Sequence, residues 1–184
     1  HFQKERAIMN FETILTNIPD YAKDIKLNLS SLINNHSPLN DSQFAGSVLA
    51  AALACKNTAL AKYVTQAVIT QLEPNEMNAV HSAVAIMGMT NIYYRFTDLV
   101  DDTSYTTMPA GLRMNILRDP GVNKIDFEMW SLVVSVIGGC HKCVSSHEQQ
   151  LIKHGITKET VQLLAKIASI VHSLACVQVI EISK

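Results

Sequence analysis

The chain has 184 residues, and 48% of them are hydrophobic, which is ample for the packed core of a single domain. Its formal net charge is −1, from 15 basic and 16 acidic residues. Because the basic residues are scattered, the sequence lacks the concentrated positive charge that attracts nucleic acid or an anionic membrane, and we expect neither as a partner.

Apolar residues recur at helical spacing along nearly the whole chain, with Gly, Pro and polar residues between the periodic segments. The sequence therefore predicts an all-α fold. Residues 1–8 precede Met9, a plausible initiator, and we treat them as a candidate remnant outside the domain. The expected helices are Phe11–Leu15, Ala22–Asn34, Asp41–Ala54, Thr58–Gln71, Asn75–Gly88, Thr90–Thr97, Asp126–Ile137, Cys140–His154 and Thr157–Ile182.

Some helix starts carry a capping signal. Asn40 precedes a long apolar run, and Thr157 lies two residues before Glu159, so side-chain oxygens can accept the unpaired N–H groups there. Between Asp98 and Asn123 the helical pattern lapses into Asp, Thr, Pro and Gly. We expect an extended connection there, with one helical turn near residues 113–117.

The two sides of this connection align with each other. A shift of 85 residues places Cys55 on Cys140, each after an apolar helix. We therefore predict a single domain over residues 9–184, built from two duplicated halves at about 9–97 and 98–184. Short Ala-rich helices also align by chance, so the pattern favours duplication without requiring it.

No feature of the sequence predicts secretion or membrane insertion. Apolar stretches such as Val48–Ala54 and Trp130–Ile137 are far shorter than the roughly 20 residues that cross a bilayer, so we expect a soluble protein. No secretory signal pattern is visible, and the expected location is cytoplasmic. Four cysteines are too few for a secreted scaffold. Two of them, Cys55 and Cys176, lie in Ala-rich surroundings and are expected to be inert core residues.

The other two cysteines, Cys140 and Cys143, form a Cys-x-x-Cys pair. Because Gly138 and Gly139 interrupt the preceding helix, the pair is expected at a helix start, where unpaired N–H groups and the helix dipole favour a thiolate. This spacing also lets the two sulfurs form a disulfide. A thiolate attacks peroxides, and a second thiol resolves the resulting sulfenic acid, so the pair suffices for a redox cycle.

Two groups near this pair can handle protons. His147 lies four residues after Cys143 on one helix face, so its imidazole can accept the thiol proton; this makes Cys143 the candidate peroxidatic thiol and Cys140 the resolving thiol. Glu128 lies on the preceding helix, with an axial mismatch to His147 of roughly 4 to 5 Å. We expect one water to span that gap, giving a relay from Glu128 through water and His147 to Cys143.

Two other functions remain open from the residues alone. Cys140, Cys143 and His147 could be part of a structural zinc site, with His172 or Glu128 as the remaining ligand. Alternatively, His147 and Glu128 could perform acid–base chemistry as a decarboxylase or lyase, with incidental thiols. We expect redox chemistry, with no bound cofactor and no metal.

Three segments around the cysteine pair resemble the alkyl hydroperoxide reductase D (AhpD) family, within the carboxymuconolactone decarboxylase-like superfamily. They read FEMWS at 127–131, GCHKC at 139–143 and VSSHE at 144–148. Further segments are similar to the same family, at 21–31, 85–89 and 111–116. The resemblance covers the chain from about Met9 to its end.

The resemblance implies an internally duplicated helical bundle that assembles as a homotrimer and reduces alkyl hydroperoxides. It also implies an adapter role, in which electrons pass from the dihydrolipoyl groups of dehydrogenase complexes to a partner peroxiredoxin. The external reductant would be a dihydrolipoyl-type dithiol. By motif position, Glu128, Cys140, Cys143 and His147 match the family's relay and thiol pair.

One position departs from the family pattern. The family often has His immediately before the second cysteine, where this chain has Lys142; its own His141 lies one place earlier. A lysine can stabilise a thiolate by its charge, but it does not shuttle protons near neutral pH without a large pKa shift. The resemblance therefore assigns no role to position 142, because the family's histidine is absent there.

Overall fold

The computed structural model describes residues 11–184, and within them every regular element is helical. The all-α prediction is confirmed. The segment 1–8, treated above as a remnant, lies outside the described residues. After a helical segment at 11–16, the elements are η1 (Asp20–Ala22), α2 (Lys23–Asn34), α3 (Asp41–Ala54), α4 (Thr58–Val68), α5 (Pro74–Leu99), η2 (Thr103–Thr106), η3 (Asn115–Leu117), α6 (Lys124–Gly138), α7 (His141–Lys153) and α8 (Lys158–Ile182).

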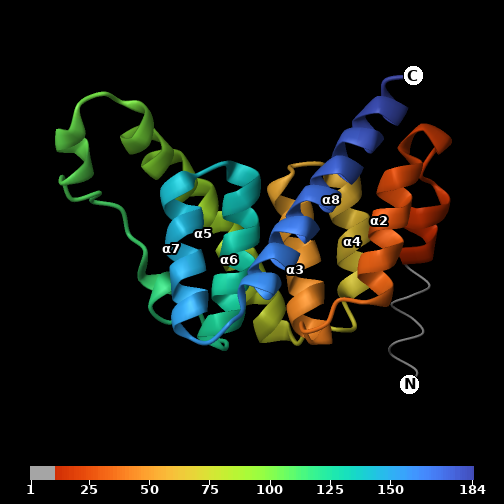
Figure 1. Ribbon diagram of the computed structural model, residues 1–184, viewed down its shortest axis with the longest axis horizontal. Coiled ribbons are helices and arrows are strands. Elements are labelled where there is room, and N and C mark those ends of the chain that lie inside the picture. Colours follow the sequence, from red (N-terminus) through yellow and green to blue (C-terminus); the bar gives the residue numbers. More distant parts are fainter. Residues whose placement is uncertain (1–10) are drawn as a thin grey trace.

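The helices gather in two groups around a central pair, α3 and α6. Figure 1 shows α5, α6 and α7 at one end of the molecule and α2, α3, α4 and α8 at the other. Both central helices are apolar around most of their surface because they are enclosed on several sides. They approach closely where Gly46 of α3 faces Trp130 of α6, because a glycine places no side chain between the ring and the α3 backbone. Trp130 is fully buried at this contact.

The long helix α5 corrects one prediction. Two helices were expected, Asn75–Gly88 and Thr90–Thr97, but a single helix runs from Pro74 to Leu99. Gly88 lies inside it with no atom within 4 Å of the position of an added Cβ. A lone glycine weakens a helix by about 1 kcal/mol and does not end it when the flanking turns are packed in the core.

The predicted caps at two helix starts are present. The Gln43 N–H donates to the Asn40 side chain over 2.8 Å, and the Gln43 side chain in turn accepts from the Asn40 N–H, which completes a capping box. At the start of α8, the Thr160 N–H donates to the Thr157 hydroxyl over 3.3 Å. These contacts fix where the central helix α3 and the long helix α8 begin.

The connection between α5 and α6 is mostly irregular, as expected, and it carries two 3-10 turns, η2 and η3, where one turn was predicted. Figure 1 shows it as the green segment that projects beyond the end of α5 and then returns beside α7. Its returning part brings Met114 and Leu117 next to the start of α7. The connection therefore supplies part of the surroundings of the cysteine pair.

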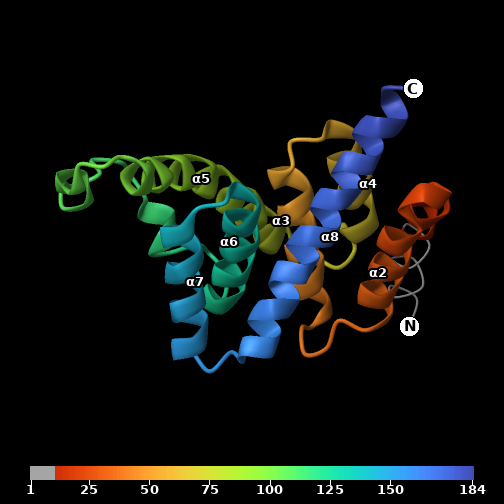
Figure 2. The same cartoon turned by 45° about the horizontal axis from the view of Figure 1, so that its top comes forward.

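The last helix, α8, extends diagonally past α3 toward the C-terminus (Figure 2). By length and composition alone it could cross a membrane, in contrast to the expectation that no stretch approaches that length. Core helices of globular proteins meet the same criterion, so this evidence is weak. In the structure, α8 buries side chains such as Leu164, Ile167 and Val171 against α3 and α6.

Candidate active site

The two cysteines of the Cys-x-x-Cys pair are joined by a disulfide. The Cys140 and Cys143 sulfurs are bonded, with a Cα–Cα distance of 5.3 Å. Gly139 caps α6 in the left-handed region, at φ 62°, where L side chains are strained, and this turn reverses the chain into α7. The helix α7 begins at His141, one residue later than predicted, and Cys140 is its N-cap. The Cys140 sulfur accepts a hydrogen bond from the Cys143 N–H over 3.2 Å.

His147 and Glu128 contact each other directly. Glu128 Oε2 lies 2.6 Å from His147 Nδ1, so the prediction that a water bridges these two side chains is wrong. Because α6 and α7 run side by side, the length of the Glu side chain covers the axial mismatch estimated from the sequence. Both groups are largely enclosed, with side-chain exposures of 11% for His147 and 15% for Glu128. A short, enclosed contact of this kind fixes the orientation of the ring.

The other ring nitrogen does not point at the disulfide. His147 Nε2 lies 3.2 Å from the Met87 thioether sulfur, and neither ring nitrogen is hydrogen-bonded to Cys143. His147 and Cys143 nevertheless line one cavity. The predicted groups therefore lie in one place. In this oxidised state, however, no hydrogen bond joins His147 to Cys143.

This cavity has a volume of about 280 Å³ and is bounded by α5, α7 and the returning connection. Its walls combine apolar and polar side chains, namely Met87, Thr90, Tyr94, Met114, Leu117, Lys142, Cys143, Ser146 and His147. Cys143 belongs to the lining, whereas Cys140 does not and is fully buried. An outside molecule that enters the cavity thus meets the Cys143 sulfur first.

Sequence reasoning gave no role to Met87, Met114 or Leu117. Met87 lies on α5, 56 positions before Cys143, and Met114 and Leu117 lie in a segment without helical periodicity. Spacing rules act within one helix or one turn, so they could not connect these residues to the cysteine pair. The only signal was that Met87 and Met114 fall within segments that resemble the AhpD family.

Comparisons with known proteins agree with this geometry. A family model described as "Carboxymuconolactone decarboxylase family" matches residues 104–179, which include the cysteine pair. Proteins called alkyl hydroperoxide reductase AhpD are similar over nearly the whole chain. The relative from Hyphomonas neptunium is 47% identical over 91% of this chain and 92% of its own length, and that from Streptomyces coelicolor is 44% identical over 90% and 93%.

The chain belongs to the AhpD family. A third relative, from Gluconacetobacter diazotrophicus, is 46% identical over 91% of both chains. Matches of this extent cover both groups of helices and the connection between them. They confirm the resemblance that the short segments around the cysteine pair indicated.

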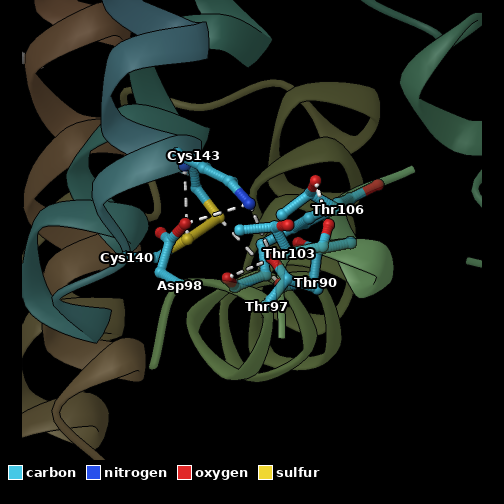
Figure 3. A network of polar contacts seen from close by, with 9 residues as sticks. Thr90, Thr97, Asp98, Thr103, Thr106, Cys140 and Cys143 are labelled. Atoms are coloured by element: carbon cyan, nitrogen blue, oxygen red, sulfur yellow. Dashed lines mark hydrogen bonds and ion pairs between the residues drawn. A yellow bond between two sulfur atoms is a disulfide. The ribbon is translucent and has the colours of Figure 1, made fainter. Parts of the chain in front are cut away.

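Lys142, where this AhpD-family chain departs from the family pattern, has its charge already paired. Its ammonium donates to the Thr97 hydroxyl over 2.8 Å and lies 3.0 Å from Asp98 Oδ1, both at the end of α5. Figure 3 shows Thr97 and Asp98 in the same network of polar contacts as the disulfide. Nearby, Arg95 donates to the Gly138 carbonyl over 2.7 Å. Two cations therefore fasten the end of α5 to the turn that presents the cysteines.

The remaining cysteines of this AhpD-family chain form a second cluster. Cys55 at the end of α3 and Cys176 on α8 each lie 3.8 Å from a different ring nitrogen of His172. Cys176 is exposed and Cys55 partly buried, so the prediction of two core cysteines is wrong, because α8 turns this face outward. Burial, assisted by the charge of Cys176, raises the pKa of Cys55 to about 11.

This second cluster also removes His172 from the suggested zinc site. His172 contacts Cys55 and Cys176, while the sulfurs of Cys140 and Cys143 are bonded to each other. Among residues 11–184, no group of three or more His, Cys, Asp or Glu side chains has the arrangement of a metal site. The donor set proposed for zinc is therefore not assembled.

Proposed function

We propose that this AhpD-family protein is an alkyl hydroperoxide reductase that works by opening and closing the Cys140–Cys143 disulfide. The observation that carries the proposal is the disulfide itself, placed at the start of α7 with one sulfur on the wall of a cavity and a His–Glu pair in the same region. The relatives named alkyl hydroperoxide reductase support the same chemistry.

The oxidative half of the cycle begins with the reduced pair. The Cys143 thiolate attacks the peroxide, so an S–O bond forms and the O–O bond breaks, and the alkoxide leaves as an alcohol after it takes a proton. Cys140 then attacks the Cys143 sulfenic acid, which releases water and closes the disulfide. We assign the peroxidatic role to Cys143 because its sulfur lines the cavity, whereas Cys140 is fully buried.

The reductive half needs two electrons from an external dithiol, for which we propose a dihydrolipoyl group. Its thiolate attacks Cys143, and Cys140 leaves. The second donor thiol then closes the donor disulfide and releases Cys143 as a thiolate. We propose that His147 gives and takes the proton at Cys143, and that Glu128 orients the ring and stabilises its charge; their 2.6 Å contact supports this pairing.

Counting free thiols tests the proposal. After reduction, the protein should present four free thiols, and one equivalent of an alkyl hydroperoxide should leave two, Cys55 and Cys176. Dihydrolipoamide should restore four, while a monothiol at equal concentration serves as the control donor. A count that does not change with peroxide would contradict the redox function.

A decarboxylase or lyase activity remains the second candidate, with His147 and Glu128 as acid and base. One observation favours it: in the closed state the ring contacts Glu128 and Met87 and not the cysteine sulfur. The matching family model also carries the word decarboxylase in its description. Incidental thiols would not cycle between four and two, so the same thiol count separates the two functions.

We propose the predicted duplication as well, within a single domain over residues 9–184 and with halves at about 9–97 and 98–184. Three helices recur in the same order: α3, α4 and α5 begin at 41, 58 and 74, and α6, α7 and α8 begin at 124, 141 and 158. The offsets are therefore 83, 83 and 84 residues rather than the 85 used in the sequence alignment, and Asn57, the N-cap of α4, corresponds to Cys140, the N-cap of α7. Each long helix packs on the other half: α5 contacts α6 and α7, and α8 contacts α3 and α4. Because each half packs its last helix against the other half, we expect the two halves to fold together as one domain.

We also propose an assembly and two partners for this protein. We expect a homotrimer that meets a lipoyl-bearing dehydrogenase component and a partner peroxiredoxin in the cytoplasm. Apolar side chains exposed along α5, such as Ile92, Phe96 and Leu99, offer a surface for such contacts. Light scattering on the purified protein measures the mass, and a mass of one chain would contradict the trimer.

A further inference from the structure

The Met87 thioether is placed among three polar groups at the edge of the proposed active site. Met87 is 2% exposed and lines the cavity together with Cys143 and His147. Its sulfur lies 3.2 Å from His147 Nε2, 3.4 Å from the Ser135 hydroxyl and 3.6 Å from the Thr90 hydroxyl. A thioether can only accept hydrogen bonds, and it accepts them weakly.

Two of these three neighbours have a nearer oxygen acceptor for their single hydrogen. The Ser135 hydroxyl lies 3.0 Å from Asn91 Oδ1, and the Thr90 hydroxyl lies 3.1 Å from the Ile86 carbonyl. Oxygen is the stronger acceptor in each case. The sulfur of Met87 is therefore left to His147.

The contact between His147 and Met87 sets where the ring carries hydrogen. On one side, Nδ1 is 2.6 Å from the Glu128 carboxylate, so a proton lies between these two atoms. On the other side, the sulfur has no hydrogen to give, so the 3.2 Å contact is a hydrogen bond only if Nε2 carries one. The arrangement of two acceptors around one ring matches a ring with hydrogen on Nε2.

We propose that Met87 is a positioning residue that holds the Nε2 hydrogen of His147 while the disulfide is closed, ready for the Cys143 thiolate that reduction releases. This inference rests on the proposed redox function. When the second donor thiol frees Cys143, the Nε2–H bond breaks and the S–H bond forms on Cys143. Because the thioether is a weak acceptor, the hydrogen is kept in place and yet given up readily to a thiolate.

The proposal makes the two halves of the cycle respond differently. In Met87→Leu the acceptor is lost while the apolar volume is nearly kept, so a hydrogen on Nε2 no longer has a partner there. Opening of the disulfide by dihydrolipoamide should slow about three- to fivefold, the equivalent of losing one weak hydrogen bond of about 0.7 to 1 kcal/mol. Oxidation of the reduced pair by peroxide should stay within about twofold, because that step needs an unprotonated Nε2.

The experiment combines stopped-flow measurement of each half-reaction with nitrogen NMR of the ring in the oxidised protein. The wild type should show hydrogen on Nε2, Met87→Leu should lose it, and Met87→Gln, which restores an acceptor, should recover it. Met89→Leu, the same change two positions along α5, is the matched control and should behave as wild type.

Two outcomes overturn the inference. One is an Nε2 hydrogen that persists in Met87→Leu, and the other is an equal slowing of both half-reactions, which a merely structural role would produce. The ring signal is read without turnover. If the wild type does not cycle with peroxide, the redox function fails by itself, while the NMR result still decides the role of Met87.

Discussion

Two clusters in this protein contain the same side chains, two cysteines and one histidine, yet their geometry differs. In the first, Cys140 and Cys143 are three positions apart at a helix start, are buried and form a disulfide. In the second, Cys55 and Cys176 come from different helices and flank the ring of His172, each 3.8 Å from it. Residue content is therefore a poor guide to redox function.

The two histidines make the same point. His147 is held by the Glu128 carboxylate at 2.6 Å, whereas the contacts of His172 within the described part of the chain are the two sulfurs. The cavities differ as well: each is about 280 Å³, but the cavity beside α8 is lined by neither Cys55 nor Cys176. A fixed ring and an accessible sulfur occur together at only one end of the described structure.

The largest expected effect separates the two cysteine pairs. Replacing the proposed nucleophile, as in Cys143→Ser, should lower peroxide consumption with dihydrolipoamide by a factor of about 1,000 or more, because no thiolate remains to attack the peroxide. Cys55→Ser and Cys176→Ser are the matched controls and should stay within about twofold of wild type. Equal rates for Cys143→Ser and wild type would reject the assigned nucleophile.

The second effect concerns the reactivity of Cys55. Its pKa of about 11, against an ordinary value of 9.0, leaves about a hundredfold less thiolate near pH 8, since burial disfavours the charged form. Alkylation of the oxidised protein by iodoacetamide, followed by mass spectrometry, should label Cys176 well before Cys55. Labelling of Cys55 should rise with pH toward 11, and equal labelling of both at pH 8 would show that Cys55 is not shielded.

The third effect tests the carboxylate that contacts His147 and that His172 lacks. Glu128→Gln keeps the shape of the side chain but removes the negative charge beside His147, so the turnover rate should fall about 10- to 100-fold. Glu148→Gln, on α7 one position after His147, is the matched control. Unchanged turnover in Glu128→Gln, measured under the same dithiol and peroxide concentrations, would remove Glu128 from the relay.

The smallest effect concerns the packing of α3 against α6, where the two groups of helices meet. An added Cβ at Gly46 would overlap the indole ring of Trp130, so Gly46→Ala should lower the free energy of unfolding by about 1 to 3 kcal/mol. Gly88→Ala meets open space in a helix interior and should raise it by about 0.5 to 1 kcal/mol. Urea denaturation of the two variants beside wild type measures both, and effects of the same sign would contradict this packing.

Much of the fold could be predicted from local patterns. Helical periodicity gave the all-α class, and Asn40 and Thr157 marked two helix starts correctly. The break expected near Gly88 was wrong, because packing of α5 along its length outweighs the low helix propensity of one glycine. The Gly138-Gly139 break, in contrast, was confirmed, since Gly139 adopts a positive φ that ends α6.

The sequence by itself determined the cysteine spacing, the helix start at which it lies and the proximity of His147, because these relations act within one turn of a helix. Only the tertiary structure decided that Glu128 touches His147 without a water and that Met87 lies on the other ring nitrogen. It alone also left Cys176 exposed. These contacts depend on how whole helices pack, and side chains far apart in the chain meet only when the core they share is complete.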